Sequence, residues 1–125
     1  MIRVYLLDDH EVVRQGLRAL LESTGDIEVV GEAGTATDAA SRIPALRPDV
    51  AVLDIGMPGL NGYEAARLIR EQPGGDGVVL VAATGWGQDE DKRRAAEAGF
   101  DHHLTKPVAP AALEKLLAAL PPPPR

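Results

Sequence analysis

Five residues that can do chemistry stand at the ends of short apolar runs: Asp8, Asp9, Asp54, Thr84 and Lys106. Three of them are carboxylates, which repel one another when they are held close together. A hard divalent cation gives a protein a reason to gather them, because Mg²⁺ prefers carboxylate, carbonyl and water oxygens. The formal charges of the three aspartates, the lysine and one Mg²⁺ sum to zero. The pattern therefore predicts a Mg²⁺ site with a lysine and a threonine beside it.

A site of this composition suits phosphoryl transfer. A carboxylate can attack phosphorus and form an acyl phosphate. A metal ion and a lysine ammonium then neutralise charge on the phosphoryl oxygens, and the hydroxyl of Thr84 would donate a hydrogen bond to another oxygen. Nucleotide hydrolysis gains no support, because the sequence lacks a glycine-rich loop of the GxxxxGK[ST] type.

The elements that must position these residues alternate along the chain. Short runs rich in β-branched residues predict strands, and apolar residues at helical spacing predict helices. The predicted strands are 2–7, 27–34, 49–54, 78–83 and 101–105, and the predicted helices are 11–22, 35–46, 61–72, 89–98 and 110–120.

Local signals refine these helices. Thr35, with Asp38 three residues later, resembles a capping box, and Pro44 is expected to kink or shorten its helix near the end. Apolar residues recur at helical spacing in the first helix, at Val12, Val13, Leu17, Leu20 and Leu21. We expect two further sets to face the core: Ala65, Ala66, Leu68 and Ile69, then Leu113, Leu116, Leu117 and Leu120.

Alternating strands and helices predict an α/β domain whose parallel sheet is covered by helices on both faces. In such sheets, ligands bind outside the carboxyl ends of the strands. Four of the five predicted strands end at one of the residues that can do chemistry. We therefore expect these residues to meet at one edge of the sheet.

The composition limits the class of protein. The 125 residues are 45% hydrophobic, include no cysteine, and carry a net charge of −6. The lack of cysteine removes disulfides and thiolate chemistry, and no apolar run approaches the ~18 residues that span a bilayer. The basic cluster Lys92-Arg93-Arg94 follows three acidic residues, so we interpret it as a solvated helix face rather than a nucleic-acid contact. We expect one cytoplasmic domain that binds neither membrane nor nucleic acid directly.

Several short motifs follow one another along the chain: Asp8-Asp9, Leu53-Asp54, Met57-Pro58-Gly59, Asn61-Gly62, Thr84-Gly85 and Lys106-Pro107. In this order and spacing they resemble the receiver domains of bacterial two-component response regulators over residues 2–120. The resemblance implies a single flavodoxin-like (βα)5 domain with the strand order 2-1-3-4-5. It also implies a phosphorelay protein whose own catalysis is limited to its phosphorylation and dephosphorylation. The phosphoryl donor would be a histidine kinase or a phosphotransfer protein.

The resemblance assigns the metal site and the phosphoacceptor. Asp54 would accept the phosphoryl group. Asp9, Asp54 and the backbone carbonyl of Gly56 would bind Mg²⁺ directly, and Asp8 would act mainly through metal-bound water.

Further roles follow from the same resemblance. Lys106 would pair with Asp54 or with the phosphoryl oxygens, and Thr84 would swing in to hydrogen-bond the phosphoryl group. The bond between Lys106 and Pro107 would be cis, which costs an X–Pro bond little. His103 occupies the switch position, where the family usually has tyrosine or phenylalanine. An imidazole is smaller than those rings and can carry a charge, so the usual aromatic rotation need not apply and pH could bias the state. His102 and His103 are interpreted as ordinary strand residues that point to opposite faces, rather than as a metal site.

The two halves of the chain resemble different relatives. Residues 8–17 resemble receivers attached to LuxR-type DNA-binding domains, whereas residues 84–104 resemble receivers carried by hybrid histidine kinases. A natural mosaic and an engineered chimera both fit this pattern. We interpret residues 1–120 as the receiver domain and residues 121–125 as a proline-rich tail or the start of a linker. The face formed by residues 88–120 would carry the change of state and a homodimer contact.

Two other functions are consistent with the sequence. One is a phosphorylation-silent binding or dimerisation module, or a scaffold built for its fold. The other is a phosphatase with an aspartate nucleophile. Such phosphatases usually place a second carboxylate, the general acid, two residues after the nucleophile. Here that position is Gly56, which disfavours turnover of outside substrates.

Trp86 is the second departure from the usual family pattern, and it leads to a prediction. In the family this position borders the phosphoryl site, so a bulky indole there, beside the small Gly56, would hinder the attacking water. We expect the Trp86→Ala variant to lose its phosphoryl group faster than the unchanged protein. The decay of phosphorylated protein with time measures this rate, and an unchanged rate would contradict the role given to Trp86.

Overall fold

The structure is a computed structural model, which describes residues 2–8, 10–23, 25–54, 62–72, 77–84, 93, 96–105 and 110–119. In this part of the chain, five parallel strands form one sheet with the order β2-β1-β3-β4-β5. The flavodoxin-like strand order predicted from the sequence is therefore confirmed. The strands are β1 (Ile2–Leu7), β2 (Ile27–Ala33), β3 (Val50–Asp54), β4 (Val79–Thr84) and β5 (His102–Thr105).

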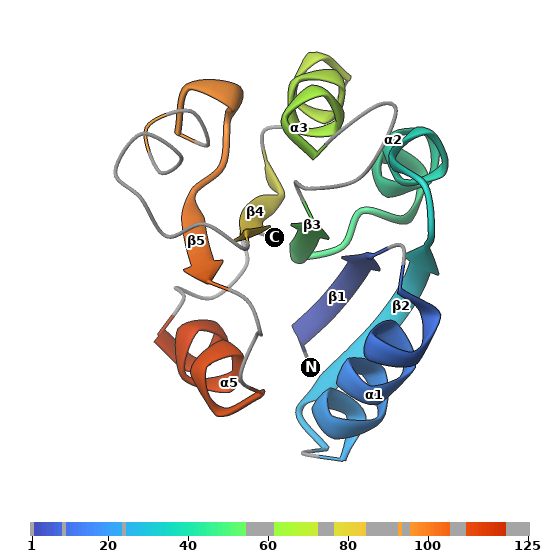
Figure 1. Ribbon diagram of the computed structural model, residues 1–125, viewed down its shortest axis with the longest axis vertical. Helices are drawn as coiled ribbons and strands as arrows, with labels where there is room; N and C mark the ends of the chain where they lie inside the picture. The colour runs from blue at the N-terminus through green and yellow to red at the C-terminus, as the bar shows by residue number, and fades with distance from the viewer. Residues whose placement is uncertain are drawn as a thin grey trace.

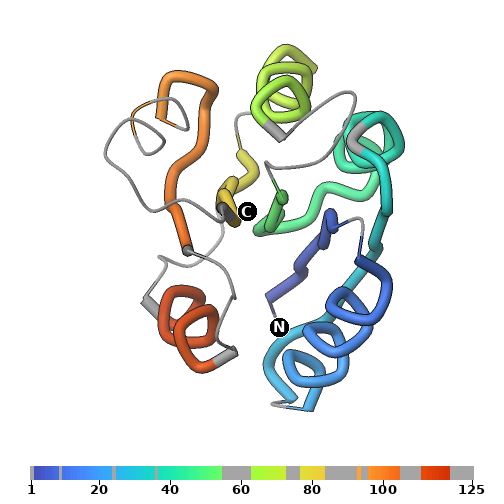
Figure 2. Tube along the Cα trace, in the orientation of Figure 1, coloured from blue at the N-terminus to red at the C-terminus, as the bar shows by residue number. Residues whose placement is uncertain are grey.

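Helices cover both faces of the sheet. Figure 1 shows α1 and α5 on one face and α2 and α3 on the other. Figure 2 follows the chain from β2 through α2 on one face to β3, a return that lets these strands run parallel. The predicted helix 89–98 lies largely outside the described residues. Within that range only 93 and 96–98 are described, and they are helical. The helices with described bounds are α1 (Glu11–Glu22), α2 (Ala36–Leu46), α3 (Gly62–Glu71) and α5 (Pro110–Ala119).

A hydrophobic core fills the space on each side of the sheet. Successive residues of a strand point to opposite faces, so each strand supplies both cores. The strand β3 is buried along its whole length, as its continuous apolar sequence predicts for a central parallel strand. The core under α2 and α3 includes Tyr5, Leu53, Ile69 and Leu80, and the core under α1 and α5 includes Leu6, Leu21, Val52 and Leu117.

The predicted start and end of α2 agree with the structure. The hydroxyl of Thr35 accepts a hydrogen bond from the backbone N–H of Asp38 at 3.3 Å, which caps the helix. Pro44 lies inside the helix, which ends at Leu46. The next residue, Arg47, has a left-handed backbone with φ of 50° and stops the helical path.

Leu68, which was expected on the inner side of its helix, is exposed, and so are three apolar residues of α1. The exposed fraction is 83% for Val12, 51% for Val13, 48% for Leu20 and 38% for Leu68. The prediction was wrong for Leu68, because the apolar surface of α3 is wider than the side that packs on the sheet; the same holds for the apolar surface of α1. The other described members of the three apolar sets are buried or half-buried, including Leu17, Leu21, Leu113, Leu116 and Leu117. None of the described helices is both long and apolar enough to cross a membrane.

The strand β2 contains a bulge that makes room for an aromatic ring. Val4 pairs with Val29 and Tyr5 with Gly31, so Val30 is an extra residue on β2. A Cβ at Gly31 would lie 2.7 Å from Cε2 of the fully buried Tyr5. Glycine at this position therefore lets the ring pack directly against the backbone.

Arg70 ties the starts of β4 and β5 to the end of α3. Its Nη1 donates to the backbone oxygen of Val78 at 2.6 Å, and its Nη2 donates to the oxygen of Gly99 and to Oδ2 of Asp101, each at 2.8 Å. The same Asp101 oxygen accepts the backbone N–H of Leu80 at 3.0 Å. One guanidinium thus fixes three segments at the end of the sheet opposite to Asp54.

The Arg70→Ala variant is expected to lower the free energy of unfolding by about 2–3 kcal/mol, because it removes charge-assisted bonds from partly buried acceptors. Urea denaturation measures the change. Arg67→Ala is the matched control, since Arg67 is exposed on the same helix, and its effect should stay within about 0.5 kcal/mol. Equal losses in both variants would show that Arg70 has no special structural role.

Candidate functional site

The sheet brings Asp8, Asp54 and Thr84 to one edge. The register pairs Leu7 with Leu53, so Asp8 and Asp54 come next on neighbouring chain segments. Thr84 follows, by one residue, the β4 partner of Asp54. Neighbouring strands are about 4.8 Å apart, so residues at the same level of adjacent strands are within reach of a single ligand.

Both aspartates are buried. The exposed fraction is 8% for Asp8 and 2% for Asp54. Burial of two nearby carboxylates is costly unless hydrogen bonds or a cation offset the charge. Part of that compensation comes from His10, whose backbone N–H donates to Oδ1 of Asp8 at 2.8 Å. The Nδ1 atom of His10 lies 3.2 Å from the same oxygen.

Asp8, His10 and Asp54 form a group that fits a cation. One potential ligand atom from each lies within 4.8 Å of the other two. The two carboxylates are the hard oxygen donors that Mg²⁺ prefers. The donor set therefore agrees with the metal that the sequence predicts, and it adds an imidazole at the rim.

Most of the other predicted site residues lie outside the part of the chain that the structure describes. Asp9, Gly56, Lys106, Pro107 and Trp86 lie outside the described residues, as does the side chain of Thr84. Their roles therefore stay predictions. His103 is half-buried and pairs in register with Ala82, whereas its neighbour His102 is exposed.

Two residues near the site were missed from the sequence. His10 follows the acidic pair directly, at the N-cap of α1. Arg14 lies in the same helical stripe as the buried Leu17 and Leu21, three and seven residues later. A charged residue in a buried stripe needs a partner, and that signal would have singled out Arg14.

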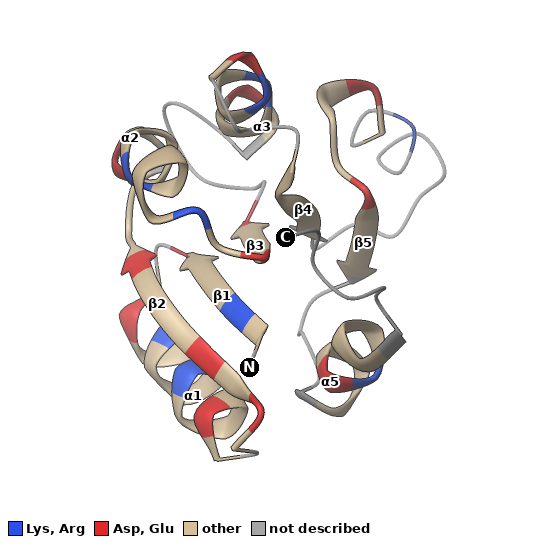
Figure 3. Cartoon of the chain, turned by 180° about the vertical axis from the view of Figure 1, so that it is seen from behind, with Lys and Arg blue, Asp and Glu red and all other residues tan. Residues whose placement is uncertain are grey.

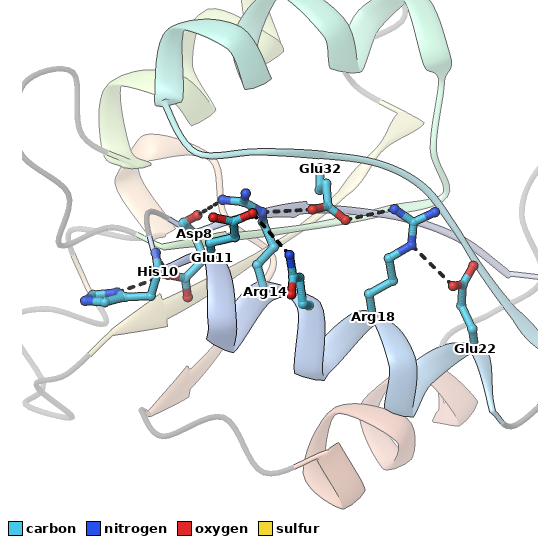
Figure 4. A network of polar contacts seen from close by, with 8 residues as sticks. Asp8, His10, Glu11, Arg14, Arg18, Glu22 and Glu32 are labelled. Carbon is cyan, nitrogen blue, oxygen red and sulfur yellow. Dashed lines mark hydrogen bonds and ion pairs between the residues drawn. The ribbon is translucent and has the colours of Figure 1, made fainter.

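Arg14 joins Asp8 to β2. Its Nη1 donates to the backbone oxygen of Asp8 at 2.5 Å, and its Nε donates to Oε1 of Glu32 at 3.1 Å. The other oxygen of Glu32 accepts from Nη1 of Arg18 at 2.9 Å, and Nε of Arg18 donates to Glu22 at 3.3 Å. Figure 4 shows this row of alternating charges from Asp8 along α1.

The charge row changes the acidity of Glu32. Burial alone would raise the pKa of this carboxyl, but the hydrogen bonds from Arg14 and Arg18 outweigh burial and lower it. The hydrogen bond to Glu32 likewise raises the pKa of Arg18. Figure 3 shows acidic and basic residues mixed on α1 and acidic residues on the adjacent β2.

The family model described as the response regulator receiver domain matches residues 4–118. The DNA-binding transcriptional activator DevR/DosR of Mycobacterium tuberculosis is 43% identical over 109 residues, which are 86% of this chain and 49% of that protein. The chain thus spans about half the length of this curated relative.

Solved structures agree in fold. Vibrio cholerae chemotaxis protein CheY4 superposes with a TM-score of 0.85 at 27% identity, over 94% of this chain and 97% of that one. The receiver domain of sensor histidine kinase PA1611 from Pseudomonas aeruginosa gives a TM-score of 0.82 at 29% identity, over 93% of each chain. That structure has a magnesium ion coordinated in the active site cleft.

Glu32 gives a prediction about pH. Its folded pKa lies below the ordinary value of 4.5, so ionised Glu32 stabilises the fold above that value, and the stabilisation is lost as pH falls through the folded pKa. Glu32→Gln is expected to lower the free energy of unfolding by about 1–2 kcal/mol near neutral pH. The difference from the unchanged protein should shrink in urea denaturation at about pH 3. A constant difference would contradict the charge-assisted bonding.

Proposed function

The chain belongs to the response regulator receiver domain family, and from this membership we propose that it accepts a phosphoryl group on Asp54. The observation that carries the proposal is the position of Asp54, which ends the wholly buried β3 beside Asp8 at the carboxyl edge of the sheet. Parallel α/β sheets bind ligands at this edge.

The reaction would be the transfer of a phosphoryl group from a donor to the carboxylate of Asp54. An oxygen of Asp54 forms a bond to phosphorus while the bond between phosphorus and the donor breaks, and the donor keeps that electron pair. A buried nucleophile of this kind is accessible only at the strand end, so the donor must approach along the sheet edge. The ammonium of Lys106 would neutralise negative charge on the phosphoryl oxygens, and the hydroxyl of Thr84 would donate a hydrogen bond to one of them.

Mg²⁺ would be held by Asp54, Asp9 and the carbonyl of Gly56, with Asp8 acting mainly through water. Asp8 and Asp54 provide the hard oxygen donors among the described residues. When bound, the ion supplies positive charge to the phosphoryl oxygens. His103 would belong to the switch, and the peptide bond between Lys106 and Pro107 would be cis.

The donor would be a histidine kinase or a phosphotransfer protein. Receiver domains of this family interact with such partners, and one similar structure is itself the receiver domain of a sensor histidine kinase. A phosphohistidine supplies the phosphoryl group in a chemical form that a carboxylate can attack.

Incubation with acetyl phosphate tests the proposal without a partner. We expect intact mass to increase by one phosphoryl group when Mg²⁺ is present, and no increase without Mg²⁺ or in Asp54→Ala. Asp38→Asn is a matched control, because it removes an exposed carboxylate on α2 and should leave the gain unchanged. A folded protein that gains no mass would favour a phosphorylation-silent module.

A further inference from the structure

We infer that Arg14 is a positioning residue, which holds the peptide between Asp8 and Asp9 and so sets the affinity for the divalent cation. The inference rests on the proposed function, because Asp8 and Asp9 matter as the acidic pair of that site. It concerns a residue that is neither a metal ligand nor a phosphoryl contact.

The backbone of Asp8 is held from both sides. Its N–H donates to the oxygen of Ala33 on β2 at 3.2 Å. Its carbonyl oxygen accepts from Nη1 of Arg14 at 2.5 Å. This carbonyl belongs to the peptide group that follows Asp8, and peptide groups are planar, so the guanidinium holds the orientation of that plane.

Glu32 holds the guanidinium in place. The side chain of Arg14 is 14% exposed and that of Glu32 is 23% exposed, so the pair is well shielded from water. Arg14 itself lies on the first turns of α1, and its backbone N–H donates to the oxygen of His10 at 2.9 Å. Figure 4 shows the guanidinium between the Asp8 end of the strand and Glu32.

Arg18 provides a matched comparison. It lies one helical turn after Arg14 and also bonds Glu32, at 2.9 Å, but its other bond goes to Glu22 at the far end of α1. Its side chain is 45% exposed. The two arginines therefore share a partner and a helix, and differ in the bond to Asp8.

Calorimetric titration with Mg²⁺ of the full chain tests the inference. We expect Arg14→Ala to weaken Mg²⁺ binding about 10-fold, the lower end of the range for residues that orient metal ligands. Arg14→Lys should recover part of the loss, because an ammonium keeps the charge but cannot bond both acceptors in the fork geometry of arginine. Arg18→Ala should stay within about twofold. Equal weakening by Arg14→Ala and Arg18→Ala, or none by Arg14→Ala, would overturn the inference.

A pair of glycine variants keeps the test decisive if Arg14→Ala fails to fold. A Cβ at Gly34 would lie 3.2 Å from Nη1 of Arg14, whereas a Cβ at Gly16 on α1 would meet nothing within 4 Å. Gly34→Ala should therefore displace the guanidinium and weaken Mg²⁺ binding a few-fold, and Gly16→Ala should not. No difference between the two variants would contradict the role of Arg14.

A measurement without metal separates this inference from the proposed function. The backbone amide resonance of Asp9 in metal-free protein should shift in Arg14→Ala and stay in place in Arg18→Ala. If the unchanged protein binds no Mg²⁺, the proposed function fails, while the amide shift still decides whether Arg14 orients this peptide. An Asp9 amide that is insensitive to Arg14 refutes the inference.

Discussion

In a sheet of buried parallel strands, polar side chains gather at the ends of the strands. Helices cover both faces of the sheet, and β3 is buried throughout, so polar groups are displaced to the strand ends. Parallel strands send all their carboxyl ends to the same edge. Asp8 and Asp54 therefore become neighbours although they are 46 positions apart in the sequence. Their proximity costs free energy because the two negative charges repel each other, and a bound cation would offset that repulsion.

The edge that carries these carboxylates depends on support from two directions. At the site, β2, α1 and the residue after the acidic pair hold Asp8 by its N–H, its carbonyl and its carboxylate. At the opposite end, Arg70 joins α3 to the starts of β4 and β5.

The sequence predicted the order of elements well because strand and helix periods differ clearly in this chain. It predicted the meeting of Asp8, Asp54 and Thr84 because strand ends in a parallel sheet share an edge. Periodicity could not predict how wide a stripe of each helix contacts the sheet, so Leu68 was misplaced and the exposure of Val12 and Leu20 was not predicted. Nor could it predict that the guanidinium of Arg14 meets the Asp8 carbonyl, since that contact depends on how the chain turns from β1 into α1.

The bulge in β2 affects how the protein meets other copies of itself. An edge strand offers unpaired N–H and C=O groups on which a strand of another molecule can grow, and β2 is an edge of the described sheet. The extra residue at Val30 breaks the even spacing of those groups, and the exposed Glu28 adds a charged side chain to this edge strand. The space made for the ring of Tyr5 thus also protects the sheet from fibrillar growth at this edge.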